Sequence, residues 1–164
     1  MDARKVASRR VLAPSAVLVV ALGGCAAAEA EPAASPLPPA EGRSPGETFA
    51  GVPEGASDPG PEDDGAAAAW TDVDGVLYVV TLGSSTCPWL AQPAAELEGE
   101  ALAVTFDEPG DGPCTADLVP TTTVVGVPAG TTTDQDLQVR LGEWGEITLP
   151  AQEAGATGDL VWTP

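Results

Sequence analysis

The chain has 164 residues, a formal net charge of −19 at pH 7 and no histidine. A surface this acidic repels nucleic acid and anionic lipid headgroups, so neither is expected as a direct partner. The missing histidine excludes Ser-His-Asp and Cys-His nucleophilic catalysis. Attraction to cations or to a basic protein patch stays open.

The N-terminus has the three parts of a secretory signal. Residues 1–10 contain four of the six basic residues, residues 11–22 are almost entirely apolar, and small residues follow. The tetrapeptide Leu22-Gly23-Gly24-Cys25 resembles the processing site of bacterial lipoproteins, in which a branched apolar residue stands three positions before the cysteine. The resemblance implies a signal peptide over 1–24 and cleavage before Cys25. Cys25 would then carry a diacylglyceryl group and acyl chains such as palmitate, and anchor the protein on the extracytoplasmic face of the cell membrane.

Two alternatives to lipidation are an ordinary cleaved signal and an uncleaved transmembrane helix. The uncharged stretch 11–28 is barely long enough to span a bilayer. It also contains Pro14 and the pair Gly23-Gly24, which disfavour a helix. Residues 8–12 resemble a twin-arginine export motif, but basic signals often contain Arg-Arg, so the export route stays open between Sec and twin-arginine.

The next segment, 25–69, is predicted to be the lipidated cysteine followed by a disordered tether. It is rich in proline, alanine, glycine and acids, and its only large apolar residues are Leu37, Phe49 and Val52. That is too little apolar surface to bury a core. The tether is therefore expected to hold a folded domain, residues 70–164, away from the membrane.

Short apolar and β-branched runs separated by turn residues predict an all-β domain over 70–164. The run 76–82 is apolar on both faces, which is typical of a central strand. Residues 93–98, with Pro93 first and Gly99 after them, predict one short helix. We expect a small antiparallel β-sandwich or barrel of six or seven strands. The main strand segments are 76–82, 102–106, 121–127, 137–141, 147–149 and 160–162, and the fourth and fifth are expected to form a hairpin.

Cys87 and Cys114 are the cysteines that remain once Cys25 is assigned to the lipid. Two cysteines in a small exported domain usually form a disulfide. A redox-active Cys87 is the competing interpretation. It is disfavoured because no C-x-x-C motif and no neighbouring His or Lys is present to lower the thiol pKa.

The segments Gly83-Ser84-Ser85-Thr86-Cys87-Pro88 and 114–122 resemble small exported lipoproteins of high-GC Gram-positive bacteria. The resemblance covers roughly residues 76–128, about a third of the chain. It supports export and the disulfide, and it implies no catalytic residue.

The remaining inventory offers little for catalysis or cofactor binding. Lys5 is lost with the signal, which leaves no Ser–Lys dyad, and without histidine there is no zinc-type ligand set. We therefore expect no catalytic residue and no cofactor. Asp107 and Asp111 are a possible acid–base pair, as in glycosidases, but a small acidic domain brings some carboxylates together by chance. Asp107, Glu108 and Asp111 are weak candidates for Ca²⁺, and a solvated turn is the favoured interpretation because the EF-hand spacing is absent.

Among the four tryptophans, Trp70 and Trp162 lie in strand-like segments and are expected in the core. Trp89 follows Cys87-Pro88 and is expected to cover the disulfide. Trp144 is expected at a loop tip, where it is the best candidate for an exposed partner-binding aromatic. The alternative, that its ring folds back on the sheet, is the more common outcome for a loop tryptophan.

The sequence thus predicts a membrane-anchored extracytoplasmic lipoprotein that acts as a binding or interaction module at the envelope. An envelope protein or a cell-wall polymer is the expected kind of partner. A cation-binding or structural wall-layer protein is the second hypothesis, and a small carboxylate-dependent enzyme is the third. Solubility in a salty or calcium-rich envelope is the simpler explanation of the charge.

Overall fold

The computed structural model describes residues 44–57, 60–61 and 64–164. These residues form eleven short β-strands and no helix. The all-β class predicted from the sequence is therefore confirmed. The strands are β1 (Thr48–Ala50), β2 (Gly65–Trp70), β3 (Val76–Gly83), β4 (Leu90–Ala91), β5 (Glu96–Glu98), β6 (Ala101–Val104), β7 (Phe106–Asp107), β8 (Val119–Gly126), β9 (Leu137–Leu141), β10 (Gly145–Leu149) and β11 (Val161–Trp162).

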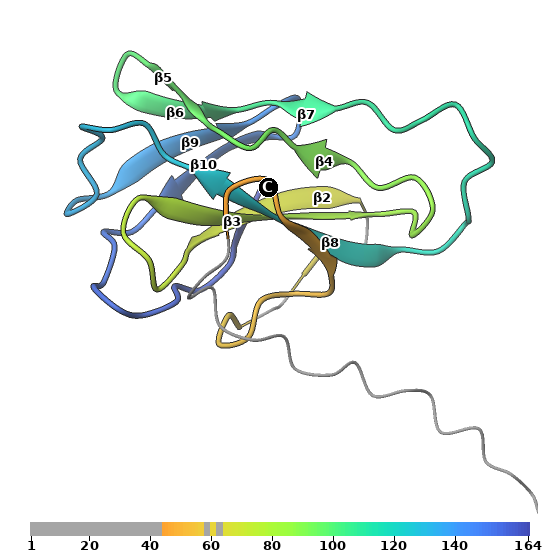
Figure 1. The fold of residues 1–164 in the computed structure, drawn as a ribbon, viewed down its shortest axis with the longest axis horizontal. Coiled ribbons are helices and arrows are strands. Elements are labelled where there is room, and N and C mark those ends of the chain that lie inside the picture. Colours follow the sequence, from red (N-terminus) through yellow and green to blue (C-terminus); the bar gives the residue numbers. More distant parts are fainter. Residues whose placement is uncertain (1–43, 58–59, 62–63) are drawn as a thin grey trace, which may run out of the picture. The chain divides into compact units, whose positions relative to one another are not determined.

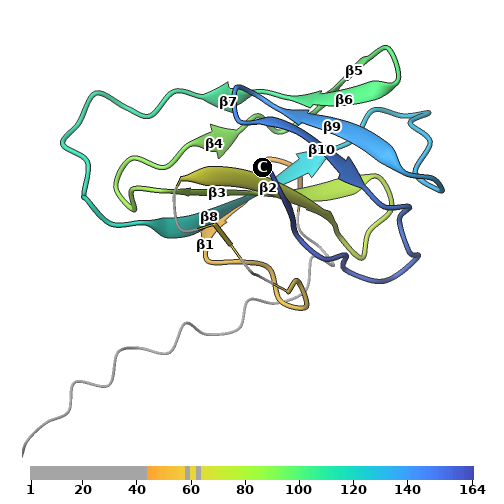
Figure 2. The ribbon, with the colours of Figure 1, turned by 180° about the vertical axis from the view of Figure 1, so that it is seen from behind.

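Two sheets stack as the layers of a small β-sandwich (Figure 1). The first has the order β1-β8-β3-β2-β11, and all its neighbouring strands are antiparallel. The second has the order β10-β9-β6-β5, in which β6 and β9 are parallel. A two-stranded ribbon of β4 and β7 lies beside them, as both ribbon views show (Figure 2).

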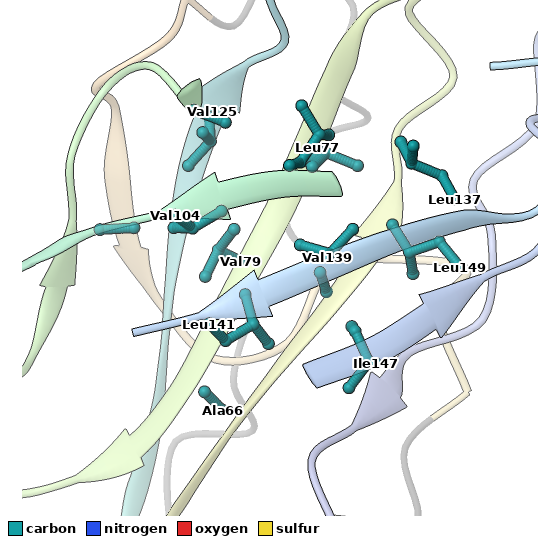
Figure 3. Packing of buried hydrophobic residues seen from close by; sticks show 14 of the residues in the cluster. Ala66, Leu77, Val79, Val104, Val125, Leu137, Val139, Leu141, Ile147 and Leu149 are labelled. Atoms are coloured by element: carbon teal, nitrogen blue, oxygen red, sulfur yellow. The ribbon is translucent and has the colours of Figure 1, made fainter. Parts of the chain in front are cut away.

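The main core lies between the two sheets. Leu77 and Val79 of β3 and Val125 of β8 pack against Val104 of β6 and Val139 of β9 (Figure 3). Each of these five side chains is at most 1% exposed. Burying a side chain of this size contributes about 1.5–3 kcal/mol, so the packing of the two layers accounts for much of the stability.

The centre of the first sheet is buried on both faces. In β2, Ala66 and Ala68 belong to the core between the sheets, whereas Ala67 and Ala69 pack with Val80 and Leu160 in a second cluster on the other side. This explains why the run 76–82 has no polar alternation. The prediction of a central strand there is confirmed, because β3 lies between β8 and β2.

The predicted boundary between tether and domain at residue 70 is wrong. β1 and all of β2 except its last residue, Trp70, lie within 25–69, and β2 is completely buried. The sequence missed β2 because its Gly-Ala-Ala-Ala-Ala run lacks the bulky β-branched residues that mark strands. In the fold, small side chains are what fits. An added Cβ on Gly65 would lie 3.1 Å from Pro61 Cγ.

The predicted helix over 93–98 is also wrong. The Pro93 carbonyl accepts a hydrogen bond from Gly126 N–H, and Ala95 N–H donates to the Gly126 carbonyl. Residues 96–98 then form β5, which pairs with β6. The backbone groups that a helix would use internally are thus bonded across to neighbouring strands. β5, together with β1, β2 and the short β4 and β7, raises the strand count above the six or seven expected.

The predicted hairpin over 137–149 is confirmed. β9 and β10 pair antiparallel from Leu137 opposite Leu149 to Leu141 opposite Gly145. Their inward residues are buried and their alternate residues are mostly exposed.

The position of β2 predicts where the chain can be shortened. A chain beginning at Ser44 should keep a cooperative urea transition, whereas a chain beginning at Trp70 should show none. Loss of residues 44–69 removes β1 and all of β2 except Trp70. The core side of the sheet is then exposed, and β3 and β11 lose their common neighbour. Far-UV circular dichroism in a urea series measures both chains, and equal midpoints would show that β2 is dispensable.

Candidate functional site

Three aromatic rings from distant parts of the sequence meet at one place. Trp89 precedes β4, Phe106 begins β7 and Trp144 lies in the turn between β9 and β10. The Trp144 and Phe106 ring centroids are 4.6 Å apart with planes at 76°, and those of Trp144 and Trp89 are 5.3 Å apart with planes at 85°. All three side chains are half-buried. Edge-to-face contacts of this kind add about 0.5–1.5 kcal/mol per pair beyond area burial.

The turn between β9 and β10 places Trp144. Gly142 N–H donates to the Val104 carbonyl at 3.0 Å, and Trp144 N–H donates to the Leu141 carbonyl at 3.0 Å. Gly142 has a φ of +51°, and a Cβ there would lie 2.9 Å from Phe106 Cδ2. Glycine is therefore needed both for the backbone conformation and for the close approach of Phe106.

Hydrogen bonds to the backbone at or near Trp89 and Phe106 hold these two residues in place. The Thr81 hydroxyl donates to the Trp89 carbonyl at 2.8 Å, which ties the segment after the disulfide to β3. Phe106 pairs with Ala91 in the β4–β7 ribbon. The three rings thus rest on three separately anchored segments.

The rings border an aromatic groove of about 510 Å³. We use this name for the cavity lined by Asp64, Trp89, Thr105, Phe106, Glu108, Gly142, Glu143 and Trp144. Its walls are aromatic, and the charged groups in its lining are all carboxylates.

Among the described residues, no Lys or Arg lies in this lining. Arg140 is the one Lys or Arg in the sequence after residue 43, and its guanidinium forms an ion pair with Glu98 on the β5 side of the second sheet. The carboxylates of Asp64, Glu108 and Glu143 therefore have no cationic partner in the part of the chain that the structure describes. The groove is a negatively charged aromatic site.

Trp144 lies at the loop tip between β9 and β10, as expected, but its side chain is only partly exposed. Its ring packs on Phe106 and on the edge of the main core, which is the alternative that the sequence left open. The prediction that Trp144 belongs to a partner-binding site is not tested by this packing, because one part of the ring stays accessible. Sequence reasoning missed Phe106 as its neighbour, since 38 positions separate them and no local pattern connects them.

The other two tryptophans are not among the residues that line the groove. Trp70 is 2% exposed, and its indole N–H donates to the Pro150 carbonyl at 2.7 Å. Trp162 is half-buried and packs against the second cluster. The core position expected for Trp70 is confirmed, and Trp162 lies at the edge of the sheet.

The disulfide between Cys87 and Cys114 is present, with a Cα–Cα distance of 5.4 Å. It ties the segment after β3 to the loop that enters β8, as expected. The sequence predicts that Trp89 covers this bridge, and the structure shows its ring packed on Trp144. The disulfide also holds together an exposed hydroxyl cluster: Ser84, Ser85, Thr86 and Thr115, joined by mutual hydrogen bonds.

Asp117 completes this hydroxyl cluster. Its carboxylate accepts hydrogen bonds from the Ser85 hydroxyl, the Thr115 hydroxyl and the Ser85 backbone N–H, in decreasing order of effect, and these lower its pKa from 3.8 to about 2. Donors to the charged form stabilise that form. The hydroxyl cluster and Asp117 thus form a hydrogen-bonded network beside the disulfide.

The three candidate calcium ligands do not converge. Asp107 accepts a hydrogen bond from the Gln92 side-chain amide, Glu108 lines the aromatic groove, and Asp111 is exposed. Across residues 44–57, 60–61 and 64–164, no group of three or more Asp, Glu, Cys or His side chains is placed to hold a metal ion. The acid–base pair of Asp107 and Asp111 gains no support either, since Asp107 is already bonded to Gln92.

The predicted signal peptide and Cys25 lie outside the described residues. Among the residues that are described, no helix is long and apolar enough to cross a membrane. Comparisons with protein-family models, with curated proteins and with solved structures found no match.

Gly142 can be tested by Gly142→Ala. A left-handed alanine costs about 1–2 kcal/mol, and the clash with Phe106 adds a further cost of about 1–3 kcal/mol. The free energy of unfolding in urea should fall accordingly, and near-UV circular dichroism from the coupled rings should weaken. Gly75→Ala is the matched control, because Gly75 has a φ of +71° with no atom within 4 Å of an added Cβ. Equal losses in the two variants would show that Phe106 does not constrain the turn.

Asp117 gives a pH prediction. Its carboxyl should titrate at a pKa of about 2, and Ser85→Ala should raise that pKa toward 3.8. Because the folded pKa is the lower one, its stabilising contribution is complete above 3.8 and is lost as the pH falls from there through about 2. Carbon-13 NMR of the carboxyl measures the titration. The exposed Thr132 lies outside the hydroxyl cluster, so Thr132→Ala should leave the Asp117 pKa unchanged. An Asp117 pKa near 3.8 in the unmodified chain would contradict the hydrogen bonds to this carboxylate.

Proposed function

We propose that this protein is a lipid-anchored extracytoplasmic binding module whose ligand site is the aromatic groove. The observation that carries the binding role is the junction of Trp89, Phe106 and Trp144 around a cavity of about 510 Å³. Cavities that bind small groups are commonly about 300–1,000 Å³, with apolar walls and a few polar groups. Tryptophan is also among the residues enriched at the centres of binding interfaces.

The anchoring part of the proposal rests on Leu22-Gly23-Gly24-Cys25 and the basic and apolar segments before it. A lipid on Cys25 would keep the β domain at the cell membrane, facing the envelope. A binding role then needs no catalytic group, in keeping with a chain without histidine.

The inorganic cation-binding alternative has less support, because no convergent ligand set was found in the described residues. A purely structural wall-layer role makes a different prediction. In that role no ligand has to bind in the groove. The next experiment must therefore distinguish a groove that binds a ligand from one that does not.

The groove can be tested with the four tryptophans of the full chain labelled with fluorotryptophan. Fluorine-19 NMR is recorded against a panel of basic peptides, neutral wall glycans and anionic wall polymers, with the signals assigned by single Trp→Phe variants. A ligand of the groove should shift Trp89 and Trp144 and leave Trp70 and Trp162 unchanged. If no member of the panel shifts the first pair, or if all four signals move together, the groove is not the binding site and the structural role is favoured.

The anchor can be tested by the intact mass of the unreduced protein from the membrane fraction of the producing cell. The mass should correspond to a chain beginning at Cys25 with a diacylglyceryl group, less two hydrogens for the disulfide. Cys25→Ala should abolish the lipid and the processing. A lipid-free soluble chain, or a full-length mass in the unmodified protein, would contradict lipidation.

A further inference from the structure

The charge of the aromatic groove narrows the choice of ligand. Asp64, Glu108 and Glu143 line it, and none of the described residues in its lining is Lys or Arg. Carboxylates accept hydrogen bonds but donate none when ionised. A ligand that supplies donors and positive charge is therefore complementary, whereas an anionic ligand would be repelled.

The aromatic walls favour the same ligand. The faces of aromatic rings carry negative electrostatic potential and attract ammonium and guanidinium groups within about 6 Å. The planes of Trp89 and Phe106 are each nearly perpendicular to that of Trp144. Ring faces with different orientations therefore border one cavity, an arrangement that suits a cation approached from more than one side.

The combination of apolar walls and acidic groups favours an organic cation over a bare metal ion. A bare metal ion would need several converging oxygens, and such a set was not found in the described residues. A lysine or arginine side chain has an apolar stem that packs on rings and a charged end that pairs with carboxylates. Its two parts match the two kinds of surface in the groove.

The rest of the domain does not compete for this site. Arg140 is held by Glu98, and the sequence after residue 43 contains no other Lys or Arg. The described residues therefore supply no free cation to the groove. The overall negative charge would also speed the approach of a basic partner at low salt.

We propose that the aromatic groove binds the ammonium or guanidinium end of a lysine or arginine side chain in a basic peptide segment of a partner. This inference rests on the proposed function and names its ligand class. The stem of the side chain packs on Trp144 and its neighbouring rings, while the charged end lies among the three carboxylates.

The test uses the full chain in a non-ionic detergent and a short capped peptide containing two lysines. Binding is followed by tryptophan fluorescence and by the fluorine-19 signals of Trp89 and Trp144. The same peptide with acetylated lysines keeps the stems and removes the charge. Acetylation should weaken binding by about tenfold or more, because it removes both the ion pairs and the attraction to the rings.

Two triple variants with the same change in net charge locate the effect. Asp64→Asn, Glu108→Gln and Glu143→Gln together should weaken binding of the unmodified peptide by about tenfold. The matched control replaces three exposed carboxylates outside the groove (Glu100→Gln, Asp134→Asn and Glu146→Gln) and should change binding by less than about twofold at 0.15 M salt, where distant charges are screened. Urea unfolding of both triples confirms that each remains folded.

Equal binding of the acetylated peptide would overturn the proposal without relying on any variant. Equal losses in the two triples would also overturn it, because the attraction would then be a diffuse effect of net charge. If a neutral glycan shifts Trp89 and Trp144 and the lysine peptide does not, the groove remains the binding site but its ligand is not a cation. If no probe shifts these two signals, the proposed function falls as well.

Discussion

The rest of the fold packs on the β2–β3 pair, because both faces of this pair are buried. Its outer neighbours complete the first sheet, one of its faces forms the core against the second sheet, and its other face is covered by Leu160 and the segments around it. A strand buried on both sides accepts a polar residue only where it finds a partner, as Thr81 does in its hydrogen bond to the Trp89 carbonyl, and it leaves little room for bulk where covering segments lie close. The alanines of β2 meet this constraint, since small side chains allow covering segments to approach closely.

The aromatic groove depends on this core without being part of it. Val104 and Leu141 lie in the buried centre, and the residues just beyond them, Phe106 and Trp144, emerge at the end of the second sheet. Gly142 then allows the β9–β10 turn to fold onto Phe106. The site is therefore built on strand ends and a tight turn, which positions its rings more firmly than a long loop would.

The hydroxyl cluster beside the disulfide and the aromatic groove differ in whether their carboxylates have partners within the chain. Beside the disulfide, Asp117 is satisfied by hydroxyl and backbone donors from its own chain, so that region is complete in itself. In the groove, the carboxylates of Asp64, Glu108 and Glu143 have aromatic neighbours and no cation from the described chain. This difference in internal compensation is the physical reason to look for a ligand at the second region and not at the first.

The sequence by itself determined the all-β class, the central strand at 76–82, the hairpin of β9 and β10 and the pairing of Cys87 with Cys114. The all-β class, the central strand and the hairpin follow from local hydrophobic patterns. The disulfide follows from the number of cysteines, which leaves few possible pairings. Tertiary structure alone decided that residues 65–70 form a buried strand, that residues 96–98 form a strand in place of a helix, and that Trp89, Phe106 and Trp144 meet. These outcomes depend on contacts between segments far apart in the chain, and the free energy of such contacts overrides the weak local preferences of alanine, proline and glutamate.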